Sequence, residues 1–414
     1  MDERYDAIIV SIDYDDGLID YYEKELANLC EANNLNKVYK VRQKLDKPKV
    51  GYFVGVGKLD EIKMIAQSYD IELVIFNDEL SPSQIRNIEN YLNLEIIDRS
   101  MLILNIFASR AKTNESMIEV ALAQYKYMLP RLVGLSKSLS RQGGGFNAKG
   151  PGETQLELDR RKIEKRIYKL EADLKKINVS RQNRINKRKD KTVALVGYTN
   201  SGKSKLMNAL IEMYQDNKKQ VFSKDMLFAT LTTSNRKITF PDNQSFILTD
   251  TVGFVSKLPH HLVNSFKSTL QEITEADLIL HIIDCANPNF KLQIDVTNKV
   301  LEEIGCKDIP IIYVYNKCDL LSEQFFPDEE NSIMISAKTG FNVRLLANTI
   351  KKTILNEVTT LELFIPYDRG DLINKLKNNE NIIKMEYLDD TINVLATIKD
   401  KNLHLYEKYK KSLD

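Results

Sequence analysis

The order of apolar and polar residues divides the first hundred positions into short strands and helices. Compact apolar runs predict strands at residues 7–12, 38–41, 72–76 and 95–98. Apolar residues at helical spacing predict helices at residues 18–30, 58–69 and 101–109, and a further helix that opens at Ser81 and Pro82. Because strands that alternate with helices form parallel sheets, we expect a small α/β domain over residues 1–111.

The next region has the pattern of a long helical hairpin. Helical stretches at about 100–111 and 114–129 precede a polar, glycine-rich segment, residues 136–152, which we expect to be an exposed loop. From residue 153 to about 189, apolar residues repeat at the spacing of a coiled-coil seam. We therefore expect a helical linker over residues 112–190, in which the later helix packs on the 114–129 helix. The seam residues are Leu156, Ile163, Ile167, Leu170, Leu174 and Ile177.

The alternation of strands and helices resumes in the second half of the chain. It predicts a second α/β domain over residues 191–357. Strand patterns at residues 361–366 and 391–399, on either side of a helical pattern at 372–376, predict a small α+β domain over residues 358–414.

Charge adds one feature to this picture. The formal net charge is +1, so attraction to nucleic acid must come from local clusters of positive charge. The helix after residue 153 carries such a cluster, which fits either a solvated helix face or a phosphate-backbone partner. The candidate RNA contacts are Arg141, Gln142, Gly143, Gly144, Gly145, Lys149, Arg160 and Arg161.

Cysteine spacing and hydropathy indicate the cellular compartment in which the protein is expected. The four cysteines form no close-spaced pair, so neither a zinc site nor a disulfide framework is indicated. No apolar stretch of about 18 residues occurs, so no transmembrane segment is predicted. Free thiols without a signal peptide favour the reducing cytoplasm.

A phosphate-binding loop follows the first strand of the second α/β domain. The strand at residues 192–196 runs into a glycine-rich turn, and an apolar helix continues from Leu206. In this setting backbone N–H groups surround phosphate oxygens, Lys203 supplies a cation to the β- and γ-phosphates, and the Ser204 hydroxyl binds Mg²⁺. The candidate contacts are Gly197, Tyr198, Thr199, Asn200, Ser201, Gly202, Lys203, Ser204 and Lys205.

Two further motifs complete a guanine-nucleotide site. The strand at residues 246–248 ends at Asp250, Thr251, Val252 and Gly253, where the carboxylate would hold Mg²⁺ and the Gly253 N–H would sense the γ-phosphate. The strand at residues 311–315 ends at Asn316, Lys317 and Asp319, and a later strand leads to Ser336, Ala337 and Lys338. A carboxylate at Asp319 accepts hydrogen bonds from guanine N1–H and the 2-amino group, which adenine lacks, so GTP is favoured over ATP.

The segment between these motifs should supply a switch threonine. We choose Thr230, next to Phe228 and Ala229, as the residue that closes on Mg²⁺ and the γ-phosphate; Thr232 and Thr233 are alternatives. The expected metal ligands are therefore Ser204, Thr230 and Asp250, and the expected catalytic residues are Lys203, Thr230 and Gly253. Phe254 stands where many such enzymes place a glutamine that orients water, which predicts slow intrinsic hydrolysis.

Asn200 has two interpretations. Its side-chain carbonyl could help bind a potassium ion beside the phosphates, or it could simply stabilise the loop through a hydrogen bond. Comparison of turnover in KCl and NaCl separates the two.

The chain as a whole resembles the HflX family of ribosome-associated P-loop GTPases. Besides the nucleotide motifs, the resemblance rests on Gly55, Val56, Gly57 and Lys58, on the segments 80–84, 98–99, 129–132 and 150–157, and on Ile365, Pro366 and Tyr367. Thr232 and Thr233 depart from the Asp-Pro that the family often has, and Ser116 and Met117 from a common Gly-Lys pair.

The resemblance implies a monomer that binds the large ribosomal subunit and its rRNA and, with GTP bound, separates stalled or stressed ribosomes into subunits. Hydrolysis would then permit release. Two alternatives remain open: a GTP-dependent ribosome assembly or RNA-chaperone factor, and a regulatory GTPase that binds only proteins.

Overall fold

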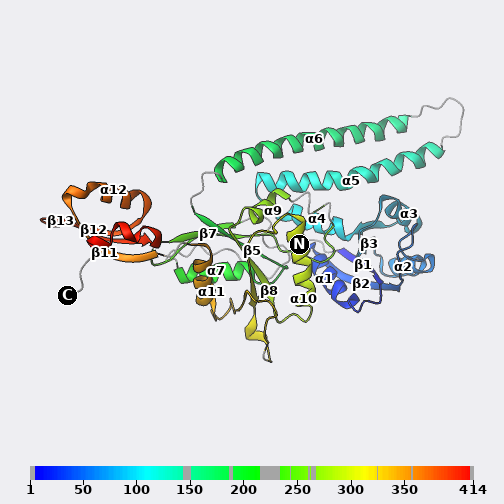
Figure 1. Ribbon diagram of the computed structural model, residues 1–414. Coiled ribbons are helices and arrows are strands. Elements are labelled where there is room, and N and C mark those ends of the chain that lie inside the picture. The colour runs from blue at the N-terminus through cyan, green and yellow to red at the C-terminus, as the bar shows by residue number, and fades with distance from the viewer. Residues whose placement is uncertain are drawn as a thin grey trace.

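The computed structural model describes residues 5–142, 151–185, 190–214, 234–242, 244–259, 262, 267–323, 325–355 and 358–410. Figure 1 shows an N-terminal α/β unit beside a central α/β unit, with a long pair of helices lying along both and a C-terminal unit at the opposite end from the N-terminal one. None of the described helices combines the length and apolar character that a membrane span requires.

The N-terminal unit is a four-stranded parallel sheet in the order β2-β1-β3-β4. Helices α1 and α4 cover one face of the sheet and α2 and α3 the other, each with its own apolar core. The predicted elements are present, with ends shifted by a few residues. Their bounds are β1 Tyr5–Asp13, α1 Ile19–Ala32, β2 Leu35–Lys44, α2 Val56–Tyr69, β3 Leu73–Phe76, α3 Pro82–Leu92, β4 Glu95–Asp98 and α4 Arg99–Arg110.

Polar side chains fix where two of these helices begin. Ser81 accepts a hydrogen bond from the Gln84 N–H and the Gln84 side chain accepts one from the Ser81 N–H, which together form a capping box in front of Pro82. Asp98 caps α4 by accepting the Met101 N–H at 2.9 Å. Asp98 also accepts from Arg131 at 3.1 Å, and so joins the next helix to the N-terminal unit.

Helices α5 (Asn114–Gln142) and α6 (Pro151–Ile185) lie side by side and run in opposite directions, as the hairpin prediction required (Figure 1). The predicted loop over residues 136–152 is too long at both ends. The helix continues to Gln142 because residues 136–142 contain neither glycine nor proline. The second helix begins at Pro151 because proline is well suited to the first position of a helix.

The central unit is a six-stranded sheet in the order β10-β9-β8-β5-β7-β6, parallel except for the antiparallel edge strand β6. Helices α7 and α11 pack on one face, and α9 and α10 on the other, which confirms the doubly wound fold. The bounds are β5 Lys191–Gly197, α7 Lys203–Tyr214, β6 Ser234–Thr239, β7 Ser245–Asp250, α9 Lys267–Thr274, β8 Leu278–Asp284, α10 Phe290–Glu303, β9 Ile311–Asn316, β10 Ser332–Met334 and α11 Val343–Ile354.

The C-terminal unit is a three-stranded antiparallel sheet in the order β11-β13-β12, packed against helix α12. The strand β12 (Asn381–Tyr387) was not predicted, because a shift in register between Ile382 and Lys384 breaks its alternation of apolar and polar residues. The other bounds are β11 Val358–Pro366, α12 Gly370–Asn379 and β13 Thr391–Lys399.

The N-terminal and central units share one hydrophobic core. Val252, Val255 and Leu262, which follow the end of β7, pack with Leu26 of α1 and Ile103 of α4. The segment that leaves the end of β7 is therefore enclosed by the N-terminal unit.

Candidate nucleotide-binding site

The loop between β5 and α7 has a backbone that only particular residues adopt easily. Gly197 and Gly202 have φ angles of +150° and +97°, and Asn200 has a φ of +61°. A Cβ atom at Gly197 would lie 2.2 Å from the carbonyl oxygen of Ile282, so any side chain there would collide with the neighbouring strand. The loop turns directly into α7, whose first N–H groups suit a phosphate.

Lys203 is held inside this loop. Its Nζ donates to the carbonyl oxygens of Gly197 at 2.9 Å and Tyr198 at 2.8 Å. Burial lowers the pKa of Lys203 to about 8, and the nearby Asp250 carboxylate opposes that shift. The ammonium group is thus fixed where phosphate oxygens would supply the negative charge that its buried position lacks.

Ser204 and Asp250 meet beside the lysine. The Ser204 Oγ donates to Oδ2 of Asp250 at 2.6 Å, and the adjacent Thr251 hydroxyl donates to the Leu195 carbonyl at 2.6 Å. A hydroxyl and a carboxylate at this separation fit Mg²⁺, which binds proteins through few oxygen ligands and takes the others from water and substrate phosphates.

The backbone after Asp250 lies against the phosphate-binding loop. The Thr199 N–H donates to the Phe254 carbonyl at 2.8 Å, and the Phe254 N–H donates to the Gly197 carbonyl at 3.2 Å. A Cβ atom at Gly253 would lie 3.0 Å from Nζ of Lys203, so glycine lets this backbone approach the lysine closely. The Phe254 side chain packs into the apolar core and cannot orient a water molecule.

Asn316 connects the phosphate-binding loop to the loop after β10. Its Nδ2 donates to the Ser201 carbonyl at 2.8 Å, and its Oδ1 accepts the Ala337 N–H at 2.9 Å. A Cβ atom at Gly202 would lie 2.2 Å from the same Nδ2, so the contact requires glycine. These contacts place the two loops that would hold phosphate and base at the carboxyl edge of one sheet, where ligands bind in doubly wound folds.

Asp319 presents an exposed carboxylate at this edge. A hydrogen bond from Ser336 lowers its pKa, and the positive charges of Lys338 and Lys205 act in the same direction. Lys317, with a φ of +68°, donates to Oδ2 of Asp284 at 2.7 Å. An ionised Asp319 can accept two hydrogen bonds from a guanine edge.

The nucleotide motifs thus converge, while other predicted residues are not placed. Phe228, Ala229 and Thr230, with the alternatives Thr232 and Thr233, lie outside the described residues, as do residues 143–150.

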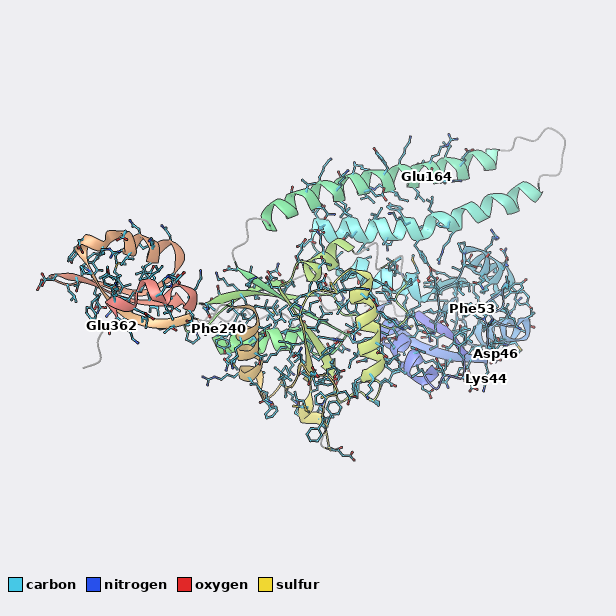
Figure 2. The ribbon with its side chains drawn as sticks, in the orientation of Figure 1. Lys44, Asp46, Phe53, Glu164, Phe240 and Glu362 are labelled. Carbon is cyan, nitrogen blue, oxygen red and sulfur yellow. The ribbon has the colours of Figure 1, made fainter. Side chains whose placement is uncertain are left out.

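The basic face of the hairpin carries partners of its own. Arg160 and Arg161 of α6 pair with Glu164 at 2.8 Å and Glu157 at 2.6 Å, and Figure 2 labels Glu164 on this helix. Their positive charge is thereby partly balanced, and RNA contact by these arginines stays a prediction.

Sequence reasoning missed the residues of the N-terminal unit that reach the site. The Tyr198 hydroxyl hydrogen-bonds to the carboxylate of Glu25, which lies 173 positions earlier in the chain. The sequence signal was a glutamate on the apolar face of α1, next to Leu26 and four residues before Leu29. Such a residue indicates a buried polar partner without identifying it.

Comparisons with known proteins agree with this arrangement. Three family models match consecutive parts of the chain: "GTP-binding GTPase N-terminal" over residues 20–108, "GTP-binding GTPase Middle Region" over 110–188, and "50S ribosome-binding GTPase" over 192–317.

Curated relatives match nearly end to end. A "GTPase HflX" of Caldanaerobacter subterraneus subsp. tengcongensis is 43% identical over 380 residues, covering 91% of this chain and 86% of the relative. The "GTPase HflX" of Escherichia coli is 38% identical over 416 residues, covering 96% and 95%. Among solved structures, a GDP complex of SsGBP is 25% identical and covers 84% of this chain and 98% of that one, with a TM-score of 0.47.

Proposed function

We propose that this chain, which belongs to the HflX family of GTPases, binds the large ribosomal subunit and separates stalled or stressed ribosomes into subunits. The GTP-bound form performs the separation, and hydrolysis permits release. One observation carries the proposal: the loops of Lys203, Asp250 and Asp319 meet at one sheet edge, in a domain that matches a family described as 50S ribosome-binding GTPases. A cytoplasmic location follows from this partner.

The residues of the site have distinct roles in this proposal. Lys203 neutralises the β- and γ-phosphates, whose negative charge would raise the pKa of this buried ammonium back toward its ordinary value. Ser204, Asp250 and Thr230 would hold Mg²⁺, whose positive charge would offset the charge of the phosphates. The Gly253 N–H contacts the γ-phosphate. These contacts position the nucleotide and leave the attacking water to be organised by another group.

The base is read by the loops on the other side of the site. Asp319 accepts from the guanine edge. The Ala337 N–H, which donates to Asn316 Oδ1 at 2.9 Å, would share its hydrogen with guanine O6 when the base is bound. Replacing guanine by adenine would leave the Asp319 carboxylate without its donors, so ATP binds more weakly.

Ribosome stimulation is proposed from the place of Phe254. Because its side chain is 2% exposed and packs in the core, this position cannot orient the attacking water. In this proposal a partner supplies that organisation, and the ribosome is the partner that the family match favours. The helical hairpin and its loop would approach rRNA, with Arg160 and Arg161 exchanging their glutamate partners for phosphates.

Sucrose-gradient profiles of purified ribosomes test the proposed function. Ribosomes incubated with the protein and a non-hydrolysable GTP analogue are expected to shift from the assembled peak to subunits, and those incubated with GDP are not. The Lys203→Ala variant should be inactive in the same assay. An unchanged profile, together with immature particles accumulating when the protein is absent from cells, would contradict splitting and support an assembly role.

We also propose that Asn200 contributes to a potassium site. Asn200 is exposed and has a φ of +61°, which places it at the turn of the phosphate-binding loop. GTP turnover is then expected to be faster in KCl than in NaCl at equal ionic strength, and an Asn200→Ala variant should lose the difference. Equal turnover in the two salts would leave Asn200 with a loop-stabilising role only.

A further inference from the structure

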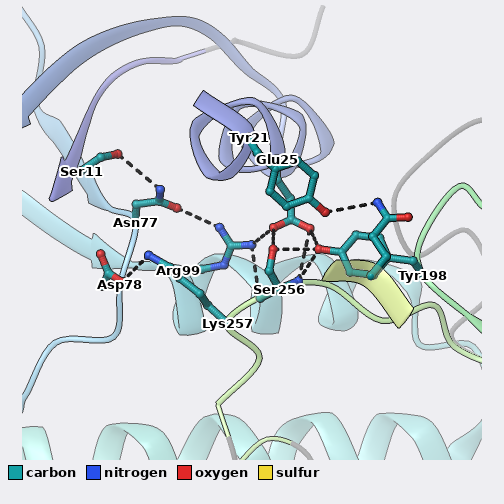
Figure 3. A network of polar contacts seen from close by, with 10 residues as sticks. Ser11, Tyr21, Glu25, Asn77, Asp78, Arg99, Tyr198, Ser256 and Lys257 are labelled. Atoms are coloured by element: carbon teal, nitrogen blue, oxygen red, sulfur yellow. Dashed lines mark hydrogen bonds and ion pairs between the residues drawn. The ribbon is translucent and has the colours of Figure 1, made fainter. Parts of the chain in front are cut away.

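A buried polar cluster joins four segments of the chain next to the nucleotide site (Figure 3). Its members are Glu25 of α1, Arg99 at the start of α4, Tyr198 of the phosphate-binding loop and Ser256, three residues after Gly253. Their exposed fractions are 6%, 1%, 5% and 2%. Two of them belong to the N-terminal unit and two to the nucleotide-binding motifs, so the cluster spans the interface between the units.

The Glu25 carboxylate is the centre of this cluster. It accepts hydrogen bonds from the Arg99 guanidinium, from the Tyr198 hydroxyl and from the Ser256 side chain, and the Ser256 N–H lies 3.3 Å from its Oε1. Arg99 in turn donates to the Ser256 carbonyl at 3.0 Å and to Asn77 at 2.8 Å. The backbone and side chain of Ser256 are thus held from several directions by residues of the N-terminal unit.

These hydrogen bonds are directional and buried, so their main effect is to fix the positions of the groups that form them. Burying a carboxylate and a guanidinium costs free energy that their mutual attraction and their other hydrogen bonds only offset. Such a cluster therefore contributes less to overall stability than to the choice of one arrangement of its members. Moving Ser256 would break its bonds to Glu25 and Arg99 together, and would leave this buried ion pair with fewer hydrogen bonds.

A second anchor lies one residue further along. Lys257 has a φ of +51°, which is costly for a residue with a side chain, and its Nζ donates to Oδ1 of Asp78 at 2.6 Å. The same ammonium lies 4.5 Å from the ring centroid of Tyr22. Val252 and Val255 pack in the core of the N-terminal unit, so residues 252–257 are fixed on both sides of Gly253.

We propose that Glu25 is a positioning residue of the GTP site. Through Tyr198 and Ser256 it fixes residues 252–257 against the phosphate-binding loop, and so keeps the Gly253 backbone next to Lys203, where the γ-phosphate binds. This inference rests on the proposed role of Gly253. Docking of the N-terminal unit and binding of the γ-phosphate are then thermodynamically coupled. Docking strengthens γ-phosphate binding, and γ-phosphate binding strengthens docking to the same extent.

The proposal concerns the γ-phosphate and not the whole nucleotide. GDP lacks the group that Gly253 would contact, and the base is held by Asn316 and Asp319, which are outside the cluster. Loss of the Glu25 carboxylate should therefore weaken binding of a GTP analogue and leave binding of GDP nearly unchanged. General damage to the nucleotide site would instead weaken binding of both nucleotides.

Glu23 offers a matched control on the same helix. It is also buried, with 0% exposure, but it pairs with Arg42 at 2.6 Å and with Lys40 at 3.3 Å, both on β2 of the N-terminal unit. Glu23→Gln therefore removes a buried carboxylate charge from α1 without touching the cluster around Ser256.

The test measures dissociation constants for GDP and for a non-hydrolysable GTP analogue by fluorescence titration of the full chain. In Glu25→Gln, Tyr198→Phe and Ser256→Ala, the preference for the GTP analogue over GDP is expected to fall by about fivefold or more, within the range usual for coupled sites. Glu23→Gln should keep the wild-type preference. The double variant Glu25→Gln/Ser256→Ala should lose little more than Glu25→Gln alone, because the two residues act through shared bonds.

Three results would overturn the inference. The first is an unchanged or raised preference for the GTP analogue in folded Tyr198→Phe and Ser256→Ala, which keeps the test valid even where Glu25→Gln does not fold. The second is an equal loss in Glu23→Gln, and the third is full additivity in the double variant. Failure of the wild-type protein to bind GDP would instead contradict the proposed function itself, and the inference with it.

Discussion

At the scale of single residues, the site depends on close approaches that leave no room for a side chain. Gly202 shows this most sharply, because a Cβ atom there would lie 2.2 Å from Nδ2 of Asn316. We predict that Gly202→Ala weakens GDP binding by about tenfold or more, since either the loop or Asn316 must move; tenfold corresponds to roughly 1.4 kcal/mol. Isothermal titration calorimetry measures the effect.

Gly305 provides the control for that experiment. It has a φ of +90°, close to the +97° of Gly202, but a Cβ atom would meet nothing within 4 Å. Gly305→Ala therefore carries the backbone strain without the collision, and it should bind GDP normally. Equal loss of affinity in both variants would show that a general effect of backbone strain, and not the contact with Asn316, lowers the affinity for GDP.

His281 predicts a dependence of stability on pH. It lies buried on β8 under the phosphate-binding loop, and burial, with the charge of Lys203, lowers its pKa to about 3. The unfolded chain takes up this proton below its ordinary pKa of about 6.5, whereas the folded chain does not. The free energy of unfolding should therefore fall as pH drops from about 6.5 toward 3.

A His281→Leu variant tests this origin of the acid sensitivity. Urea midpoints measured from pH 5 to pH 8 should decline less steeply toward acid in the variant than in the wild type. Parallel curves would mean that other groups account for the pH dependence.

The sequence allowed the contiguous residues of the site to be predicted but not those that arrive from elsewhere. Gly202 and Lys203 stand at fixed spacing after a strand, so the loop chemistry can be deduced from local order alone. Glu25 belongs to another domain, and no spacing rule connects it to Tyr198 or Ser256. Its role depends on how two domains dock, which periodicity does not encode.

At the scale of helices and strands, burial separates a seam position of α6 from a leucine outside the seam. Leu170 of α6 is 7% exposed, whereas Leu158 on the same helix is 48% exposed. We predict that Leu170→Ala lowers the stability of the hairpin by about 2–5 kcal/mol, because it empties a packed position. Leu158→Ala should change it by less than about 0.5 kcal/mol. Hydrogen exchange of the α6 amides reports both, and equal protection in the two variants would contradict the packing.

The elements themselves were predicted where their periodicity is regular. The capped start of α3 at Ser81 and Pro82 and the strand β4 were found in place. The strand β12 was missed, since a register shift at Ile382 disturbs its pattern. The predicted loop, residues 136–152, is longer than the one observed, because α5 continues to Gln142 and α6 begins at Pro151. The glycines and the proline of residues 143–152 interrupt less of the chain than the pattern predicts.

At the scale of the whole molecule, the docked N-terminal unit is connected directly to the nucleotide site. Val252 and Val255 leave the nucleotide site and enter the core of that unit, so a change in the site and a change in docking cannot be independent. The sequence pattern predicts a division into domains, but it does not predict the core that the N-terminal and central units share. The buried Phe254 side chain lies in the apolar core, so this position does not supply the group that orients the attacking water.

The proposal that this GTPase acts on the large ribosomal subunit is tested most directly by its rate of GTP hydrolysis. The rate is measured for the purified protein alone and with purified large or small ribosomal subunits. We expect slow GTP turnover by the isolated protein, clear stimulation by large subunits, and no stimulation by small subunits. Rapid turnover by the isolated protein, or a rate that large subunits leave unchanged, would contradict it.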